Sequence, residues 1–333
     1  MAPVYSLVLP LFNEEAVVPL LLRRLDALLD ALDAPAEVIL VDDGSSDSSP
    51  LVLEAKAKAD PRYRILRLAR NFGHQIAITC GLEHAMGQAV VVMDADLQDP
   101  PEVVLDMAAK WREGFEIVYA QRLTREGESR FKRATANLFY RLIDRLSEVD
   151  IPRDVGDFRL VDRKALDAFL AMPERDRFVR GMFAWIGFRQ AVVAFHRPAR
   201  AAGETKYPLT KMLRLAANGV VSFSDAPLRL ALWAGVVISG AALAYGVAIA
   251  IMAVSGAAFA RGWSSTIVIV AFLGGANMLM TGLLGLYVGR IYSEVKRRPL
   301  YVLERAIGFE PRQAALPDSV ARLPVGTQRE ARR

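Results

Sequence analysis

Two long runs without a charged side chain constrain the fold of this chain more than any other feature. They span Leu230 to Val254 and Trp263 to Gly289, roughly 25 residues each. At about 1.5 Å per residue, a helix of this length crosses a hydrocarbon core of about 30 Å. The alternative is a hairpin buried in the core of a soluble protein, but two adjacent uncharged runs of this length are rare there. We therefore expect two transmembrane helices.

Basic residues beside these runs predict which side of the membrane each end faces. The connection between the runs, Ser255 to Gly262, carries only Arg261, whereas the outer flanks are much more basic. The flanking basic residues are Lys206, Lys211, Arg214, Arg229, Arg290, Lys296, Arg297 and Arg298. Because basic loops stay on the cytoplasmic side, we expect a multi-pass protein of the inner (cytoplasmic) membrane with both termini and the large N-terminal region in the cytoplasm. The first ten residues lack the basic start of a signal peptide, so none is expected.

The overall composition fits this location. Hydrophobic residues make up 53% of the 333 residues, and the mean hydropathy is +0.22. Cys80 is the only cysteine, which excludes an intrachain disulfide and fits a reducing compartment. A net charge of +5 and a pI near 9.4 are compatible with nucleic-acid binding. However, the basic residues gather beside the apolar runs, where anionic lipid headgroups attract them. The membrane surface is the simpler partner, and no nucleic acid is expected.

The N-terminal half alternates between strand-like and helix-like segments. The predicted strands are Tyr5–Pro10, Glu37–Val41, Tyr63–Leu68, Ala89–Met93 and Phe115–Tyr119, and the predicted helices are about Glu15–Leu32, Gln75–Met86 and Glu102–Arg112. This alternation predicts the α/β class, with a largely parallel sheet covered by helices on both faces. No Gly-x-Gly-x-x-Gly motif follows the first strand, which argues against a dehydrogenase.

One predicted strand ends in a group of metal-binding residue types. The apolar run Val90 to Met93 is followed by Asp94 and Asp96, with Gln98 two positions further on. In a strand, residues i and i+2 lie on the same face, so the two carboxylates can point at one ligand. Carboxylate and amide oxygens suit Mg²⁺ or Mn²⁺, and open α/β sheets bind ligands at the carboxyl ends of their strands. A solvated turn after a strand is the alternative for an isolated pair of this kind.

Six motifs occur in the order typical of one enzyme family. They are Leu9-Pro-Leu-Phe-Asn-Glu-Glu15, Val41-Asp-Asp-Gly-Ser-Ser-Asp47, Arg70-Asn-Phe-Gly-His-Gln75, Asp94-Ala-Asp-Leu-Gln-Asp-Pro-Pro101, Gly203-Glu-Thr-Lys-Tyr207 and Gly289-Arg-Ile-Tyr-Ser-Glu-Val-Lys-Arg-Arg-Pro299. With them the chain resembles the GT-A family 2 glycosyltransferases over almost its whole length. More narrowly, it resembles the membrane-anchored polyprenyl-phosphate glycosyltransferases, which include dolichyl-phosphate mannose synthases and bactoprenol glucosyltransferases.

The resemblance implies a nucleotide-diphosphate sugar as donor, with a UDP-sugar expected. It assigns the nucleotide pocket to residues at the ends of the first two strands and to the first acidic residue of the Asp94 motif. These residues are Pro10, Phe12, Asn13, Glu14, Asp42, Asp43 and Asp94. Asp43 matches the carboxylate that accepts a hydrogen bond from the pyrimidine ring. Capping of the next helix is the alternative for Asp42 and Asp43, and the two roles can coexist. Asp94, Asp96 and Gln98 are the implied metal site, where the cation stabilises the departing diphosphate.

The implied acceptor is a polyprenyl phosphate at the membrane surface. Its phosphate is mostly ionised at neutral pH, since the second pKa of a phosphate monoester is about 6. Such a nucleophile needs positioning and relief from repulsion more than a strong base. Four basic residues match family positions for this task and form a predicted cationic clamp: Arg122, Arg130, Arg200 and Lys206. A solvated basic face or contact with lipid headgroups is the alternative for each.

Asp157 occupies the place of a catalytic carboxylate in related enzymes. It would act as a base or would orient Arg159 or the sugar. His74, His84 and Cys80 are interpreted as structural, because His84 and Cys80 lie on a predicted helix and His74 in a turn.

The predicted organisation has four parts. Residues 1–208 form a cytoplasmic GT-A catalytic domain, 209–228 an amphipathic juxtamembrane segment, 229–290 a two-helix transmembrane domain and 291–333 a cytoplasmic tail. The amphipathic segment would hold the catalytic domain against the bilayer, with an ordinary core helix as the alternative.

The resulting hypothesis is an inverting, Mg²⁺- or Mn²⁺-dependent hexosyltransferase that moves glucose from UDP-glucose to undecaprenyl phosphate. Mannose, an N-acetylhexosamine or an aminoarabinose derivative is the alternative sugar. A processive synthase is disfavoured because a Gln-x-x-Arg-Trp motif is absent. An inactive membrane scaffold is the alternative from another class, and a homo-oligomer is compatible with the sequence.

Overall fold

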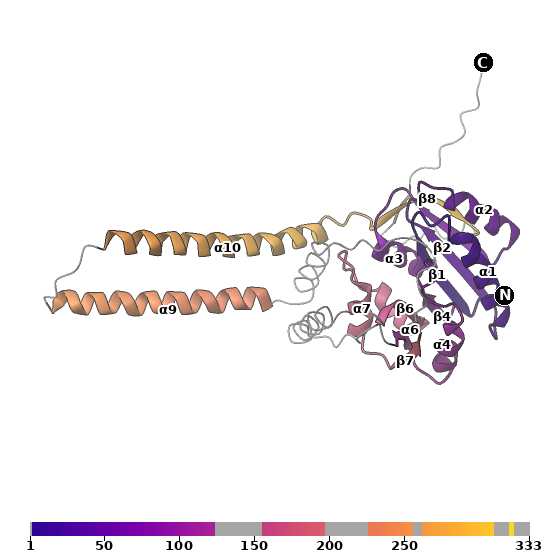
Figure 1. The fold of residues 1–333 in the computed structure, drawn as a ribbon, viewed down its shortest axis with the longest axis horizontal. Helices are drawn as coiled ribbons and strands as arrows, with labels where there is room; N and C mark the ends of the chain where they lie inside the picture. The colour runs from indigo at the N-terminus through magenta and orange to yellow at the C-terminus, as the bar shows by residue number, and fades with distance from the viewer. Residues whose placement is uncertain (1, 124–154, 197–225, 256–261, 310–319, 323–333) are drawn as a thin grey trace, which may run out of the picture. The chain divides into compact units, whose positions relative to one another are not determined.

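A computed structural model describes residues 2–123, 155–196, 226–255, 262–309 and 320–322 (Figure 1). The chain separates into two compact units. One unit contains a β-sheet and its covering helices. The other contains two long helices, α9 (Ala226–Val254) and α10 (Trp263–Val295), which lie side by side and contact each other.

The sheet has nine strands within the described residues, in the order β7-β5-β6-β4-β1-β2-β3-β8-β9. Its centre is parallel: β4, β1, β2 and β3 all run in one direction. On one side β6 is antiparallel to both β4 and β5, and β7 is parallel to β5. On the other side β8 is antiparallel to β3 and parallel to β9. The strand bounds are Tyr5–Leu11 (β1), Ala36–Asp42 (β2), Tyr63–Leu68 (β3), Ala89–Val92 (β4), Ile117–Arg122 (β5), Val155–Asp162 (β6), Gln190–Phe195 (β7), Tyr301–Ile307 (β8) and Val320–Arg322 (β9).

Helices cover both faces of the sheet, which explains why its central strands are apolar throughout. Side chains alternate between the two faces of a strand. In β1, Leu7 and Leu9 belong to the hydrophobic cluster that contains buried residues of α1, α2 and α4, whereas Val8 belongs to the cluster that contains residues of α3, α6 and α7. Strands buried on both faces read as continuous hydrophobic runs. The helix bounds are Val18–Ala31 (α1), Ser49–Ala59 (α2), His74–His84 (α3), Val103–Arg112 (α4), Arg163–Leu170 (α6) and Val179–Trp185 (α7).

The helix α3 packs unusually close to the sheet. A Cβ atom placed on Gly81 would lie 2.3 Å from Val8 Cγ1 and 3.0 Å from Val41 Cγ2. Only a residue without a side chain fits there. Because His74 and Gln75 begin the same helix, this close packing helps to set the position of both side chains at the strand ends.

The predicted α/β class with a mostly parallel sheet is confirmed. The bounds of the predicted strands and helices differ from the observed ones by at most three residues. The predicted strands do not include β6, β7, β8 or β9, and the antiparallel pairs of the sheet were not predicted.

The prediction of two apolar helices long enough to cross a membrane is confirmed in part. Among the described residues, one stretch is long and apolar enough to cross a bilayer, the 24 residues Phe272–Val295 of α10. α9 contains a shorter apolar stretch, Ala231–Tyr245, so the second span stays a prediction. The predicted amphipathic segment lies almost entirely outside the described residues.

Candidate functional site

The carboxyl ends of β1, β2 and β4 meet at one edge of the sheet, because these strands are parallel and adjacent. Leu11 pairs with Asp42, and Val8 pairs with Val92. The loops that follow therefore bring together Asn13, Asp43 and Asp94. This edge is where open α/β sheets bind their ligands.

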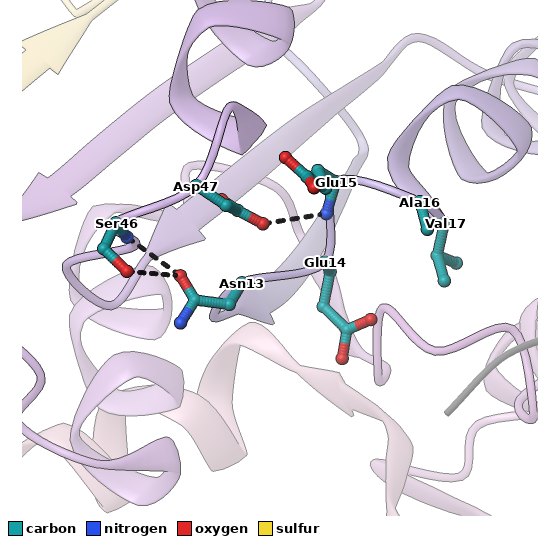
Figure 2. Close-up of a pocket in the computed structure, with 7 residues that line it drawn as sticks. All are labelled: Asn13, Glu14, Glu15, Ala16, Val17, Ser46 and Asp47. Atoms are coloured by element: carbon teal, nitrogen blue, oxygen red, sulfur yellow. Dashed lines mark hydrogen bonds between the residues drawn. The ribbon is translucent and has the colours of Figure 1, made fainter. Parts of the chain in front are cut away.

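Hydrogen bonds connect the loop after β1 to the loop after β2 (Figure 2). Ser46 N donates a hydrogen bond to Asn13 Oδ1 over 2.8 Å, and Asn13 N donates to Ser45 Oγ over 2.9 Å. Glu15 N donates to Asp47 Oδ2 over 3.1 Å. Asn13 has a φ of 54°, a left-handed conformation that asparagine tolerates better than most residues. The two loops thus form one rigid wall.

This wall borders a pocket of about 460 Å³. Its lining residues are Asn13, Glu14, Glu15, Ala16, Val17, Ser46 and Asp47 (Figure 2). Of the residues assigned to the nucleotide, Asn13 and Glu14 line this pocket. Phe12 is exposed and Pro10 is buried within β1.

The adjacent carboxylates Asp42 and Asp43 are both buried, but they accept hydrogen bonds from different loops. Asp42 Oδ1 accepts from Ser45 N over 2.9 Å, and its Oδ2 lies 3.5 Å from Arg67 Nε. Asp43 accepts from the backbone N–H groups of Phe72 and Gly73, over 2.7 and 2.9 Å. Neither carboxylate caps α2, so the capping interpretation is wrong.

Burial raises the pKa of Asp43, although its two backbone hydrogen bonds oppose the rise. The structure therefore places Asp43 as the anchor of the Arg70–Gln75 loop. A carboxylate oxygen can accept more than one hydrogen bond, so this anchoring leaves the predicted pyrimidine contact as a prediction.

The metal-binding residue types lie in a turn and not in a strand. β4 ends at Val92, and Leu97 has a φ of 60° in the turn that follows. Asp94, Asp96 and Gln98 are partly exposed, whereas the intervening residues are buried. The alternation between exposed and buried side chains that is expected of a strand therefore continues through the turn. Asp96 Oδ1 accepts from Gln98 N over 3.0 Å, which fixes the two residues relative to each other.

These residues fit part of a divalent-cation site. Asp94 Oδ1 is buried and accepts no hydrogen bond from the residues that the structure describes, and carboxylate and amide oxygens are hard ligands. Among the described residues, no group of three or more His, Cys, Asp or Glu side chains is arranged to hold a metal. Asp94, Asp96 and Gln98 would hold a cation that takes its remaining ligands from phosphate oxygens and water, as Mg²⁺ commonly does.

Asp99 is a buried acid that the sequence analysis did not single out. It is fully buried, its Oδ2 accepts from Asp94 N over 3.4 Å, and its Oδ1 lies 3.8 Å from Arg122 Nη2. Burial and the nearby charge of Asp94 raise the pKa of Asp99 to about 7, with Arg122 opposing the rise. Asp99 therefore links the predicted metal turn to Arg122 at the end of β5.

Asp157 is the centre of a charged cluster built from three elements. It lies on β6 and is 5% exposed, measured on its side chain. Its Oδ2 lies 3.2 Å from His74 Nε2 and accepts from Gln75 Nε2 over 3.3 Å, both on α3. Its Oδ1 accepts from Arg180 Nε of α7 over 3.0 Å and lies 3.4 Å from Arg159 Nη2.

The environment keeps Asp157 ionised. Burial alone would raise the pKa of Asp157, but the hydrogen bond to His74 and the charges of Arg180 and Arg159 outweigh it. The pKa is therefore held well below its usual range. For His74, burial lowers the pKa, but Asp157 and Asp94 outweigh that effect and the pKa is raised. A carboxylate with a depressed pKa is a weak base, and the choice between a base and an orienting residue stays a prediction for Asp157.

His74 connects the Asp157 cluster to the metal turn. Its Nε2 lies 3.5 Å from Asp94 Oδ1 as well as 3.2 Å from Asp157. From the sequence, His74 was interpreted as structural, and only its place in the Arg70–Gln75 motif could have indicated this position. Arg180 was missed because no motif marked it. Arg130, Arg200 and Lys206 lie outside the described residues, so their predicted roles stay predictions.

Comparisons with known proteins point to one family. A model of that family, described as "Glycosyl transferase family 2", matches residues 6–170. The chain is similar to the uncharacterized glycosyltransferase YkcC of Bacillus subtilis, at 47% identity over 92% of this chain and 95% of that protein. It is also similar to the prophage bactoprenol glucosyl transferase homolog of Escherichia coli, at 38% identity over 90% of this chain and 98% of that protein.

Among solved structures, the chain is similar to glucosyl-3-phosphoglycerate synthase from Mycobacterium tuberculosis in complex with Mn²⁺, UDP-glucose and phosphoglyceric acid. The identity is 22%, the TM-score is 0.45, and the match covers 66% of this chain and 79% of that chain.

Proposed function

Since the chain belongs to glycosyl transferase family 2, we propose that it transfers glucose from UDP-glucose to a polyprenyl phosphate, undecaprenyl phosphate in the first place. One observation carries the proposal: the turn with Asp94, Asp96 and Gln98 meets the Asp157 cluster through His74 at one edge of the sheet. His74 thus connects the proposed site for a diphosphate-bound cation to the cluster in which Asp157 holds the guanidinium groups of Arg159 and Arg180. The lipid acceptor is supported by the relatives named bactoprenol glucosyl transferase and by the apolar stretch of α10.

The reaction needs little acid–base chemistry. An oxygen of the lipid phosphate attacks the anomeric carbon of glucose, the bond from that carbon to the diphosphate breaks, and UDP leaves with the electron pair. A single displacement of this kind inverts the anomeric configuration. Because the lipid phosphate is mostly ionised at neutral pH, the nucleophile is available without a strong base.

The protein's contribution is positioning and charge stabilisation. A divalent cation held by Asp94, Asp96 and Gln98 would neutralise the charge that develops on the leaving diphosphate. The wall of Asn13, Glu14 and Ser46 would hold the nucleoside. Asp157 would orient His74 and Arg180, and Arg122, Arg130, Arg200 and Lys206 would bind the lipid phosphate.

The location follows from the same proposal. Two spans, α9 and α10, would anchor a catalytic domain of residues 1–208 at the cytoplasmic face, with residues 209–228 at the membrane surface and 291–333 returning to the cytoplasm. The basic flanks of the two runs support this orientation.

The proposal predicts strict dependence on lipid and metal. Protein purified in detergent should release UDP from UDP-glucose only with both polyprenyl phosphate and Mg²⁺ or Mn²⁺ present. Replacing Asp96 by Ala should lower the rate by at least about 100-fold, because even outer-shell partners of a metal cost about 10–100-fold.

The matched control is Asp106→Ala, an exposed carboxylate on α4, which should keep full activity. UDP release without the lipid, or full activity of Asp96→Ala, would contradict the proposal. Mass spectrometry of the lipid product from a panel of UDP- and GDP-sugars would separate glucose from mannose, N-acetylhexosamine or aminoarabinose derivatives. Failure to bind any nucleotide sugar would favour an inactive scaffold.

A further inference from the structure

We propose that Arg180 is a phosphate-binding residue of this site, held by Asp157 so that its terminal amino groups serve a phosphate oxygen. This inference rests on the proposed function, because the phosphate is either the donor diphosphate or the phosphate of the lipid acceptor. No sequence motif indicated Arg180, and its position became apparent only in the structure.

The hydrogen bonds of Arg180 use only part of its guanidinium group. Its Nε donates to Asp157 Oδ1 over 3.0 Å. Within the part of the chain that the structure describes, no acceptor bonds Nη1 or Nη2 of Arg180. The side chain is 38% exposed, so a ligand from solution can reach it. An arginine bound to a carboxylate through Nε still presents two parallel N–H donors, which match two oxygens of a phosphate.

The backbone of Arg180 is fixed by the same cluster. Gln75 Nε2 donates to Asp157 Oδ2 over 3.3 Å, and Gln75 Oε1 accepts from Val179 N over 3.0 Å. Gln75 thus ties the residue before Arg180 to the carboxylate that Arg180 binds. A side chain held in this way loses little conformational freedom when it binds a ligand.

Arg180 is linked to the predicted metal turn through two intervening side chains. Asp157 bonds Arg180 through one oxygen and His74 through the other, and His74 is 3.5 Å from Asp94. Within the Asp157 cluster, a single carboxylate is paired with two permanently charged guanidinium groups, those of Arg180 and the fully buried Arg159. One carboxylate does not neutralise both.

A purely structural ion pair is the competing explanation. It predicts that removing Arg180 lowers stability without a selective effect on phosphate-containing ligands. The test therefore compares Arg180→Ala and Arg180→Lys with Arg189→Ala, an exposed arginine that bonds the backbone of Gly114.

Two measurements distinguish binding of the donor diphosphate from binding of the lipid acceptor's phosphate. Calorimetry with Mn²⁺ compares the affinity for UDP with that for uridine, and steady-state kinetics gives KM for polyprenyl phosphate. If Arg180 binds the donor, Arg180→Ala should weaken UDP binding by about tenfold or more and leave uridine binding unchanged. If it binds the acceptor, KM for the lipid should rise by about tenfold or more with UDP binding unchanged. These magnitudes are those of charge-assisted hydrogen bonds.

The conservative variant adds a second readout. Arg180→Lys keeps the charge but not the paired donors, so it should recover part of the loss. If Arg180→Ala does not fold, the same measurements on Arg180→Lys test the proposal. The inference is overturned if Arg180→Ala alters both quantities by less than about twofold, as expected for Arg189→Ala, or if UDP and uridine binding fall equally. UDP binding without transfer of glucose would instead contradict the proposed function and leave the assignment of Arg180 standing.

Discussion

Asp99 and Asp157 are two buried carboxylates with opposite electrostatic surroundings. Asp157 contacts His74, Arg180 and Arg159, and these lower its pKa despite burial. Asp99 has Arg122 at 3.8 Å and a second carboxylate, Asp94, nearby, so burial dominates and its pKa rises to about 7. The same residue type therefore stabilises the fold at one position and opposes it at the other.

The raised pKa of Asp99 predicts a pH-dependent cost to stability. In the unfolded chain the carboxyl group ionises near its ordinary pKa of 3.8, whereas in the fold it keeps its proton up to about pH 7. Between these values the folded state binds more protons, so stability falls as pH rises through this window. Asp99→Asn removes that cost. The variant should gain stability relative to the wild type as pH rises between 5 and 7.5, at about 1.4 kcal/mol for each pKa unit.

Thermal unfolding in detergent with EDTA, across this pH range, measures the difference. Asp106→Asn, on the exposed face of α4, should run parallel to the wild type at every pH. A constant offset between Asp99→Asn and the wild type would show that Asp99 does not change its protonation state in this window.

Among the elements, α3 depends most on close packing. It carries His74 and Gln75 at its start and Gly81 against Val8 of β1. Gly81→Ala places a methyl group 2.3 Å from Val8 Cγ1, and overpacking of a core costs about 1–3 kcal/mol. We expect Gly81→Ala to lower the unfolding free energy by this amount and to weaken UDP binding, because displacing α3 moves the loop that Asp43 anchors.

A second substitution tests whether the contact itself causes the loss. Val8→Ala removes the atom nearest to the new methyl group, so the double variant should be more stable than the sum of the single effects implies, by about 0.5–3 kcal/mol. Leu166→Ala is the control, since this buried residue of α6 is not among the atoms nearest to Gly81. It should combine additively with Gly81→Ala, and equal coupling for both pairs would contradict the packing argument.

The elements that could be predicted from the sequence are those whose burial is uniform. β1, β2 and β4 are covered on both faces and read as apolar runs, so their positions and their ligand-binding ends were foreseen. β6 was missed because Asp157 and Arg159 interrupt its apolar pattern, and only the tertiary contacts make these charges tolerable in a buried strand. β8 was missed because three of its seven residues are exposed, with Glu304 and Arg305 in its centre.

The candidate site could also be predicted only in part. Motifs named Asp94, Asp96 and Asp157, but spacing alone could not show that His74 joins them or that Arg180 reaches Asp157 from α7. Those contacts depend on how α3 and α7 pack on the same face of the sheet.

For the molecule as a whole, β8 makes the sheet unit discontinuous in sequence. β8 follows α10 in the chain but pairs with β3, and its Tyr301 is fully buried, with the hydroxyl donating to Glu83 over 2.6 Å. Two deletions should therefore behave differently. A chain that ends at residue 225 loses β8 and leaves the edge of β3 unpaired, whereas a chain in which a long Gly/Ser linker replaces residues 226–296 keeps it.

We expect the linker variant to be monomeric without detergent and to bind UDP. The truncated chain should aggregate, because an unpaired edge strand is a template for association. Size-exclusion chromatography and UDP titration of both variants measure this. Equal behaviour of the two would show that β8 is dispensable for the sheet.

The β8–β3 pair also bears on how the chain is synthesised. β3 is complete early in translation, but its partner emerges only after both long helices. If these helices enter the bilayer, β8 reaches β3 only when the chain has crossed back to the side where it began, which requires an even number of crossings. A molecule with a single inserted helix would leave β8 on the opposite side and the sheet unfinished. If both helices span the membrane, the β8–β3 pair can therefore form only after both have been inserted.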